Sequence, residues 1–102
     1  MTSREKLTEQ EIKERVATLN GWTALCGKLH KEFRFLDFVQ AFGFMCSVAL
    51  IAEGMGHHPE WSNVYNRVVI DLATHDAGGI TALDVEFARR VDALPAQESP
   101  AR

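Results

Sequence analysis

Three stretches of the chain repeat apolar residues at the spacing of three to four positions that is typical of a helix. Thr8 and Glu11 at the start of the first stretch, and Thr81 and Asp84 at the start of the third, form the capping-box pattern of a helix start. Asp37 can cap the second stretch. The sequence therefore predicts helices over about 8–20, 38–54 and 81–94.

Between the predicted helices, apolar and polar residues alternate, as in strands that are packed on one face and exposed on the other. Leu29, Phe33 and Phe35 share one parity, and polar residues fill the other. The predicted strands are 22–26, 29–35, 62–64 and 67–74. The order α-β-β-α-β-β-α favours an α+β fold, with three helices packed on one face of a four-stranded antiparallel sheet.

The second predicted helix is apolar on more than one side. Its apolar residues include one stripe: Phe38, Ala41, Phe42, Met45, Val48, Ala49 and Ala52. We expect Phe38, Phe42 and Met45 of this stripe to lie in the core or at a subunit interface. Further apolar residues lie around the rest of the helix at Val39, Phe44, Leu50 and Ile51. The run is short for a bilayer span, and a helix that is apolar on most sides is usually buried on most sides. We therefore expect part of this surface to contact another subunit.

Composition narrows the class of protein further. A length of 102 residues fits one domain, which we place at 1–94, followed by a tail at 95–102 that we expect to be disordered. A net charge of −3 argues against a nucleic-acid partner and against binding to an anionic membrane. The polar N-terminus lacks the apolar core of a signal peptide, so we expect a cytoplasmic protein.

The two cysteines form no metal-ligand or redox spacing. Cys26 and Cys46 lie in different predicted elements, without a CxxC pattern. We expect both to be reduced and buried, in a reducing compartment.

Three of the four histidines fall in two loops that flank the last pair of strands. His57 and His58 follow the second helix, His75 follows the last strand, and Glu53 lies on the last turn of the helix. Antiparallel strands can bring these loops to the same edge of the sheet. Imidazoles can donate and accept protons near neutral pH, and a carboxylate behind a ring fixes its tautomer. The pattern predicts acid–base chemistry.

The histidines allow two other interpretations. His30, on the polar side of its strand, is read as a surface residue. A zinc site would use the same residue types, but the chain has no HxH or HxxxH pair, and adjacent histidines rarely direct both rings at one ion. We therefore expect no metal.

A longer pattern carries a resemblance to a known family. The pattern E-x3-H-H-P-x5-Y-x9-H begins at Glu53, ends at His75 and is followed by Asp84. With it the chain resembles the pterin-4a-carbinolamine dehydratases over nearly its whole length. The resemblance implies assembly as a homodimer or a homotetramer. It also implies dehydration of 4a-hydroxytetrahydropterins to quinonoid dihydropterin, without a metal or redox cofactor.

The resemblance also assigns residues. His57, His58, His75 and Glu53 would be catalytic, with Glu53 as the supporting carboxylate. The pterin would be bound by His57, His58, Pro59, Thr74, His75, Asp76 and Ala77. Gly54-Met55-Gly56 replaces bulkier or acidic residues that are common in the family, so any contact from residue 56 would be made by its backbone.

The resemblance leaves two roles open. As an enzyme, the protein would recycle tetrahydropterin after aromatic amino acid hydroxylases have used it, with a functional coupling to such a hydroxylase. As a binding module, it would serve as the dimerisation cofactor of a partner protein, through the apolar helix.

Overall fold

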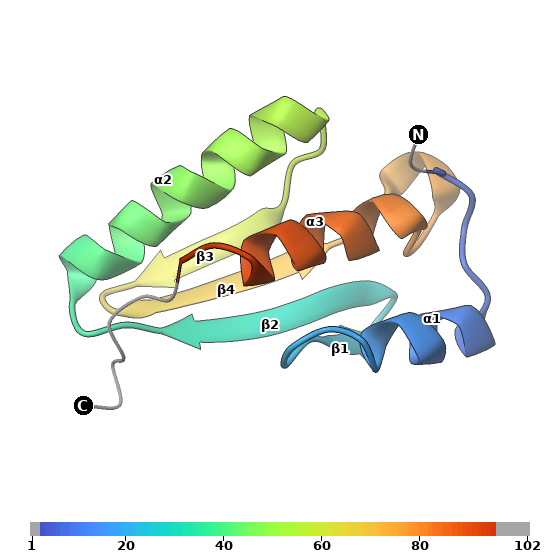
Figure 1. Cartoon of the computed structure of the whole chain (residues 1–102), viewed down its shortest axis with the longest axis horizontal. Coiled ribbons are helices and arrows are strands. Elements are labelled where there is room, and N and C mark those ends of the chain that lie inside the picture. The colour runs from blue at the N-terminus through green and yellow to red at the C-terminus, as the bar shows by residue number, and fades with distance from the viewer. Residues whose placement is uncertain (1–2, 96–102) are drawn as a thin grey trace.

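The computed structural model describes residues 3–95, which form a four-stranded antiparallel sheet with helices packed on it (Figure 1). The strands are β1 (Thr23–Leu25), β2 (Lys28–Arg34), β3 (Glu60–Val64) and β4 (Arg67–Leu72). Their order across the sheet is β1-β2-β4-β3, so β2 and β4 are the central pair. The predicted α+β fold is confirmed.

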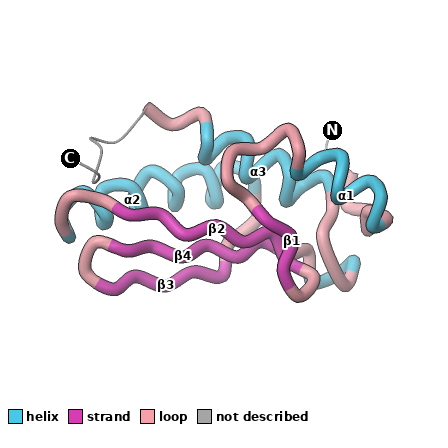
Figure 2. Tube along the Cα trace, turned by 90° about the horizontal axis from the view of Figure 1, so that it is seen from below, coloured by secondary structure: helices cyan, strands magenta, loops and turns pink. Residues whose placement is uncertain are grey.

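The helices are α1 (Glu9–Val16), α2 (Phe38–Met55) and α3 (Ala82–Asp92). Figure 2 shows α2 and α3 on one side of the strands, while the other side is left uncovered by the described residues. The order α-β-β-α-β-β-α agrees with the prediction. A short 3-10 helix, η1 (His75–Ala77), is added between β4 and α3 and was not predicted. Residues 96–102 of the predicted tail lie outside the described residues.

Side-chain caps start α1 and α3 where the sequence predicts. Thr8 Oγ1 accepts a hydrogen bond from the backbone N–H of Glu11 at 3.1 Å, and Glu11 Oε1 accepts one from the N–H of Thr8 at 2.8 Å. Thr81 and Asp84 form the same box at α3. However, α1 ends at Val16 rather than at residue 20, because the amides of residues 18 and 19 bond three positions back and form turns.

The pairing of the strands sets where β4 ends and where β3 begins. β4 ends two residues earlier than predicted, because the N–H of Thr74 bonds to the carbonyl of Gly79 at 2.9 Å and closes a loop around η1. β3 begins two residues earlier than predicted, because Glu60 already pairs with Asp71 of β4.

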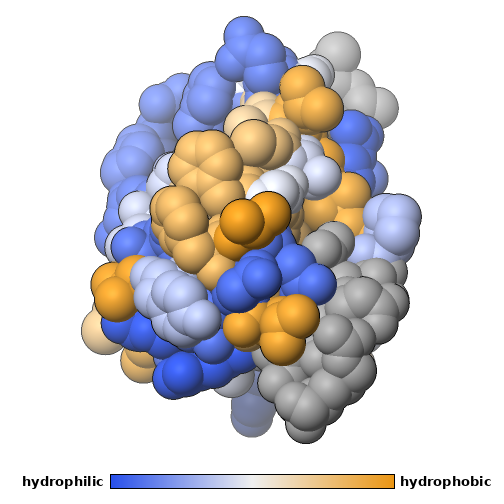
Figure 3. Space-filling view, turned by 90° about the vertical axis from the view of Figure 1, so that its left-hand side faces the viewer, coloured by the Kyte–Doolittle hydropathy of each residue, from blue (hydrophilic) through white to orange (hydrophobic). Residues whose placement is uncertain are grey.

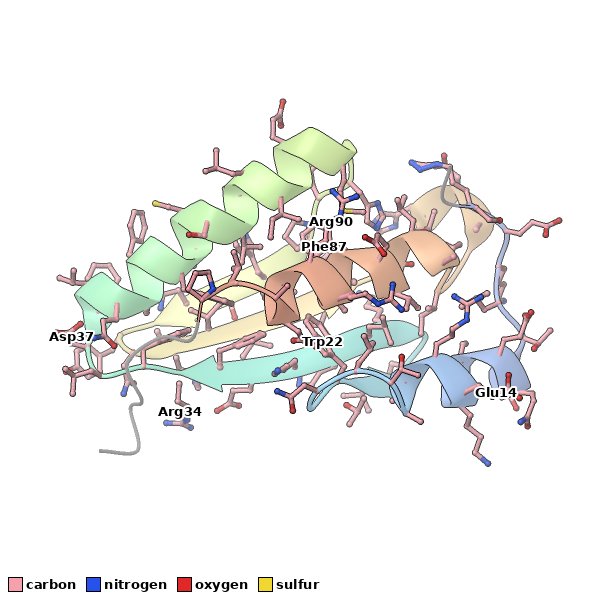
Figure 4. The ribbon with its side chains drawn as sticks, viewed as in Figure 1. Glu14, Trp22, Arg34, Asp37, Phe87 and Arg90 are labelled. Atoms are coloured by element: carbon pink, nitrogen blue, oxygen red, sulfur yellow. The ribbon has the colours of Figure 1, made fainter. Side chains whose placement is uncertain are left out.

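The core lies between the sheet and the helices α2 and α3. Four side chains on one face of β2 and β4 are fully buried: Leu29, Val68, Ile70 and Leu72. Phe87 of α3 is also buried, and Figure 4 shows it with Trp22 on the inner side of α3, while Glu14 and Arg34 point outward. Burial of each large apolar side chain stabilises the fold by about 1.5–3 kcal/mol. The ends of β4 and α2 are therefore held firmly.

Only part of the predicted apolar stripe of α2 lies in the core of this chain. The buried residues of the helix are Ala41, Phe44, Val48 and Ala52. Phe44, which we expected outside the stripe, packs on Phe33 and Phe35 with ring centroids 4.7 and 4.9 Å apart. The members of the predicted stripe that are exposed instead are Phe38, Phe42 and Ala49. Compared with the expected orientation, α2 is rotated about its axis so that the ring of Phe44, which packs on the rings of Phe33 and Phe35, lies in the core.

This rotation leaves apolar side chains of α2 in contact with solvent. We call Phe38, Val39, Phe42 and Leu50 the apolar face of α2; Val39 is 75% exposed and Leu50 is 77% exposed. Figure 3 looks at the end of the molecule where α2 begins, and hydrophobic residues gather there. By length and composition alone α2 could cross a membrane, a test that core helices of soluble proteins also pass. Its four buried residues show that it is part of the core.

The prediction of buried cysteines is wrong. Cys26 and Cys46 are both free and exposed. Cys26 lies in the tight turn between β1 and β2, with a φ of 52°, at the surface of the molecule. Cys46 lies on the side of α2 that faces away from the sheet, as a result of the rotation set by Phe44.

Candidate active site

The histidine loops enclose a small pocket between the C-terminal end of α2 and η1. It has a volume of about 220 Å³ and is lined by Arg4, Gly56, His57, His58, Ala73, Thr74, His75 and Asp76. Gly56 caps α2 in the left-handed conformation, with a φ of 63°, and turns the chain into the His pair. The N–H of His57 then bonds back to the carbonyl of Ala52 at 3.1 Å, which fixes where the pair leaves the helix.

His57 is held by a buried carboxylate. Its ring is 2.5 Å from Asp84, measured from Nε2 to Oδ1. His57 is 7% exposed and Asp84 is 0% exposed, so water does not weaken this contact. The second oxygen of Asp84 accepts hydrogen bonds from the hydroxyl of Thr74 and the N–H of Thr81, both at 2.9 Å. With Nε2–H donated to Asp84, the neutral ring presents Nδ1 as an acceptor.

His58 has an exposed carboxylate partner. Its Nε2 lies 3.2 Å from Oε1 of Glu53, on the last turn of α2. The side chain of His58 is 66% exposed, and that of Glu53 is also exposed. An exposed pair of this kind contributes about 0–1 kcal/mol, so it favours one ring orientation without locking it.

His75 has a third carboxylate partner, which the sequence did not indicate. Its Nε2 lies 3.4 Å from Oε2 of Glu60, and the side chain of His75 is 81% exposed. Lys28 lies 2.5 Å from the other oxygen of Glu60. The hydrogen bond from Lys28 lowers the pKa of Glu60, and the charge of His75 lowers it further by a smaller amount. Glu60 is therefore ionised at neutral pH and can orient the ring of His75.

Most, but not all, of the residues expected to bind the substrate line this pocket. His57, His58, Thr74, His75 and Asp76 do so. Pro59 and Ala77 are not part of its lining, and Glu53 reaches the pocket only through His58.

Sequence reasoning missed Arg4 and Ala73 in the lining, and it had allowed for Gly56 only as a backbone contact. Gly56 and Ala73 adjoin predicted loops, but no pattern in the sequence indicated Arg4. Arg4 is held near the pocket because Lys6 pairs with Thr81 and the N–H of Leu7 bonds to the carbonyl of Ile80 at 2.8 Å. Within residues 3–95, no group of three or more His, Cys, Asp or Glu side chains has the arrangement of a metal site.

Comparison with known proteins shows the family to which this chain belongs. The sequence model of the family described as pterin 4 alpha carbinolamine dehydratase matches residues 5–94. The chain belongs to this family. A relative from Solibacter usitatus, provisionally named as a pterin-4-alpha-carbinolamine dehydratase, is 58% identical over 91 residues, which are 89% of this chain and 96% of the relative. A relative of the same name from Prochlorococcus marinus is 50% identical over 88 residues, 86% of this chain and 92% of its own length.

Solved structures of the pterin dehydratase type share the fold. The transcriptional coactivator/pterin dehydratase from Brucella Melitensis superposes with a TM-score of 0.85 at 46% identity, over 90% of this chain and all of that one. A pterin dehydratase-like protein, described as a RuBisCO assembly factor in the alpha-carboxysome, gives a TM-score of 0.65 at 28% identity, over 78% of this chain and 94% of that one. Proteins with this fold thus have names that refer to a dehydratase activity in some cases and to transcriptional coactivation or RuBisCO assembly in others.

Proposed function

We propose that this protein is a dehydratase that converts 4a-hydroxytetrahydropterins to quinonoid dihydropterins by histidine acid–base catalysis. The observation that carries the proposal is that three histidines line one pocket and each has its own carboxylate partner. The substrates of this reaction arise when aromatic amino acid hydroxylases use tetrahydropterins. We therefore place the protein after such a hydroxylase and before the reductase that must convert quinonoid dihydropterin back to tetrahydropterin.

The reaction removes one water molecule from the substrate. A general acid protonates the hydroxyl on C4a, the C4a–O bond breaks as the N5 lone pair forms a C4a–N5 double bond, and a general base takes the N5 proton. We assign the acid role to His57 and His58, one for each face of C4a, and the role of base or orienting group to His75. Asp84 holds the ring of His57 in place, and as the acid His57 would carry a proton on Nδ1 in addition to the one on Nε2 that faces Asp84.

The test is the dehydration of enzymatically generated 4a-hydroxytetrahydropterin, followed by absorbance in the presence of a chelator. We expect wild type to accelerate the reaction and His58→Ala to lower kcat by about 10²–10⁴-fold, the usual contribution of a general acid. The matched control is His30→Ala, because His30, like His58, pairs with a carboxylate (Asp71 at 2.8 Å) but lies outside the pocket. Full activity in His58→Ala would contradict the assignment.

A second candidate function is that of a protein-binding module. The apolar face of α2 favours it, since large exposed apolar surfaces commonly mark contact sites. A folded wild type that does not accelerate dehydration would support this function over the enzyme.

A further inference from the structure

The histidine pocket is one of three hollows that adjoin at the same end of the sheet. A middle hollow of about 210 Å³ shares residues 73–75 with the histidine pocket. A larger hollow of about 520 Å³, which we call the α1 groove, shares residues 26–27 and 78–79 with the middle hollow. Figure 1 shows the N-terminal segment running along this end of the molecule, from the neighbourhood of η1 to α1. The three hollows therefore form one line from the histidines to α1.

Their sizes indicate that a ligand extends beyond the histidines. Pockets for small molecules commonly measure about 300–1,000 Å³. The histidine pocket, at about 220 Å³, is below this range, and it suits a ring rather than a whole substrate with a long side chain. The α1 groove, at about 520 Å³, lies within the range.

The side chains that line the three hollows carry a net positive charge, whereas the whole chain is negative. The basic side chains that line the three hollows are Arg4, Lys6, Lys13 and Lys28, against two acidic ones, Asp76 and Glu9. The whole chain carries a net charge of −3. Lys28 is already paired with Glu60, whereas no ion pair of Arg4, Lys6 or Lys13 is present within residues 3–95. Three cations are thus available for an anionic ligand.

The walls of the α1 groove combine an apolar floor with bare backbone. Leu7, Ile12 and Ile80 supply apolar surface. Gly27 and Gly78, in left-handed conformations, leave the wall toward the middle hollow without side chains. A Cβ on Gly79 would lie 3.0 Å from Cε of Lys6, so the absence of a side chain there lets the stem of Lys6 lie along the groove.

We propose that the α1 groove binds the side chain of the substrate, and that this side chain is long, apolar along its length and ends in carboxylates. The proposal rests on the function proposed above, since the histidine pocket would hold the pterin ring at the other end of the line. The apolar floor packs against the body of the side chain, and Lys6 and Lys13 bind its negative end.

The experiment uses titration calorimetry to compare the affinities of two pterins that differ in their side chains. Dihydrobiopterin has a short neutral side chain, and dihydrofolate has a long one that ends in two carboxylates. We expect wild type to bind dihydrofolate at least about tenfold more tightly, and the double variant Lys6→Gln/Lys13→Gln to lose most of this preference, by about five- to tenfold. Added salt should reduce the preference of wild type as well, because the lysines are exposed.

The control is the double variant Arg34→Gln/Arg67→Gln, which also removes two cations. Both arginines contact Glu32, and Arg34 lies at the far end of β2 from α1 (Figure 4). This control variant should keep the full preference of wild type for dihydrofolate. Equal affinity of wild type for both pterins, or a preference that survives in Lys6→Gln/Lys13→Gln, would overturn the groove proposal. The dehydration assay with a short-tailed substrate tests the proposed function separately, because that substrate does not reach the groove.

Discussion

The carboxylate of Asp84 accepts hydrogen bonds from the ring of His57, the hydroxyl of Thr74 and the amide of Thr81. All of these groups are buried, so each lost bond leaves an unsatisfied polar atom in the protein interior. Such a loss costs about 1–3 kcal/mol. A single carboxylate therefore holds together a histidine of the pocket, the loop after β4 and the start of α3.

Asp84→Asn should lower both stability and activity. An amide cannot accept all of these bonds, because one of its two ends donates. We expect the free energy of unfolding to fall by about 2 kcal/mol in urea titrations, and kcat for dehydration to fall at least about tenfold. Asp71→Asn is the control, since Asp71 pairs with His30 on the face of the sheet opposite to the buried Leu29 and Leu72. Equal effects of the two substitutions would contradict this role for Asp84.

The contact between Lys28 and Glu60 should make stability depend on pH in the acidic range. Lys28 lowers the pKa of Glu60 in the folded protein, so folding favours the ionised form. The stabilisation is present above the pKa of the unfolded carboxyl, about 4.3, and is lost as the pH falls through the lower folded pKa.

Urea titrations between pH 3 and pH 7 can detect this effect by comparison with Glu60→Gln. The advantage of wild type over Glu60→Gln should be full near neutral pH and should shrink below about pH 4. Glu14→Gln, on the outer side of α1, controls for the loss of one surface charge (Figure 4). An advantage of wild type that stays constant over the whole range would show that the ion pair does not contribute.

At the scale of secondary-structure elements, the end of α2 offers a matched pair of substitutions. Gly54 is helical and a Cβ there would meet nothing within 4 Å, whereas Gly56 is left-handed with a φ of 63°. Gly54→Ala should therefore raise the free energy of unfolding by about 0.5–1 kcal/mol. Gly56→Ala should lower it by about 1–2 kcal/mol, because an L-residue is strained in this conformation.

These two variants also test how the His pair is placed. Gly56→Ala shifts the turn that leads into His57, so we expect kcat for dehydration to fall together with stability. Gly54→Ala should leave kcat unchanged. If neither variant changes stability, the left-handed cap does not fix the end of α2.

The elements that were predicted well are those with local causes. Thr8 with Glu11 and Thr81 with Asp84 mark helix starts through contacts within one turn. The end of β4 could not be predicted, because it depends on the bond between Thr74 and Gly79 across a loop. The rotation of α2 was also beyond the sequence, since an almost uniformly apolar helix contains no signal for which side meets the sheet.

At the scale of the whole molecule, the apolar face of α2 predicts self-association. Phe42→Glu/Leu50→Glu places two charges on this face without touching the core, because both side chains are exposed. We expect wild type to sediment as a homodimer or homotetramer in analytical ultracentrifugation and the double variant to sediment as a smaller species. Arg89→Glu/Arg90→Glu on α3 is the control, since both arginines are exposed and their ion pairs within residues 3–95 are with Glu86. A monomeric wild type would contradict the prediction.

The composition of the pocket depends on contacts between distant parts of the chain. His57, His58 and His75 were predicted because their loops flank one pair of strands. Arg4 could not be predicted, because only its placement beside α3 brings it to a pocket more than 50 positions away in the sequence. Glu60 was missed for a related reason, since its contacts with Lys28 and His75 require the register of three strands.

Asp84 serves both the fold and the histidine pocket, and this double role affects which substitutions related sequences can accept. A descendant that no longer needed dehydration would still need Asp84 to start α3, and with Asp84 retained it would keep a buried partner such as His57. His58 and His75 are exposed and carry little of the fold, so they are free to change once selection on the chemistry ends. In relatives that have lost the activity, we therefore expect substitutions at positions 58 and 75 to occur before substitutions at positions 57 and 84.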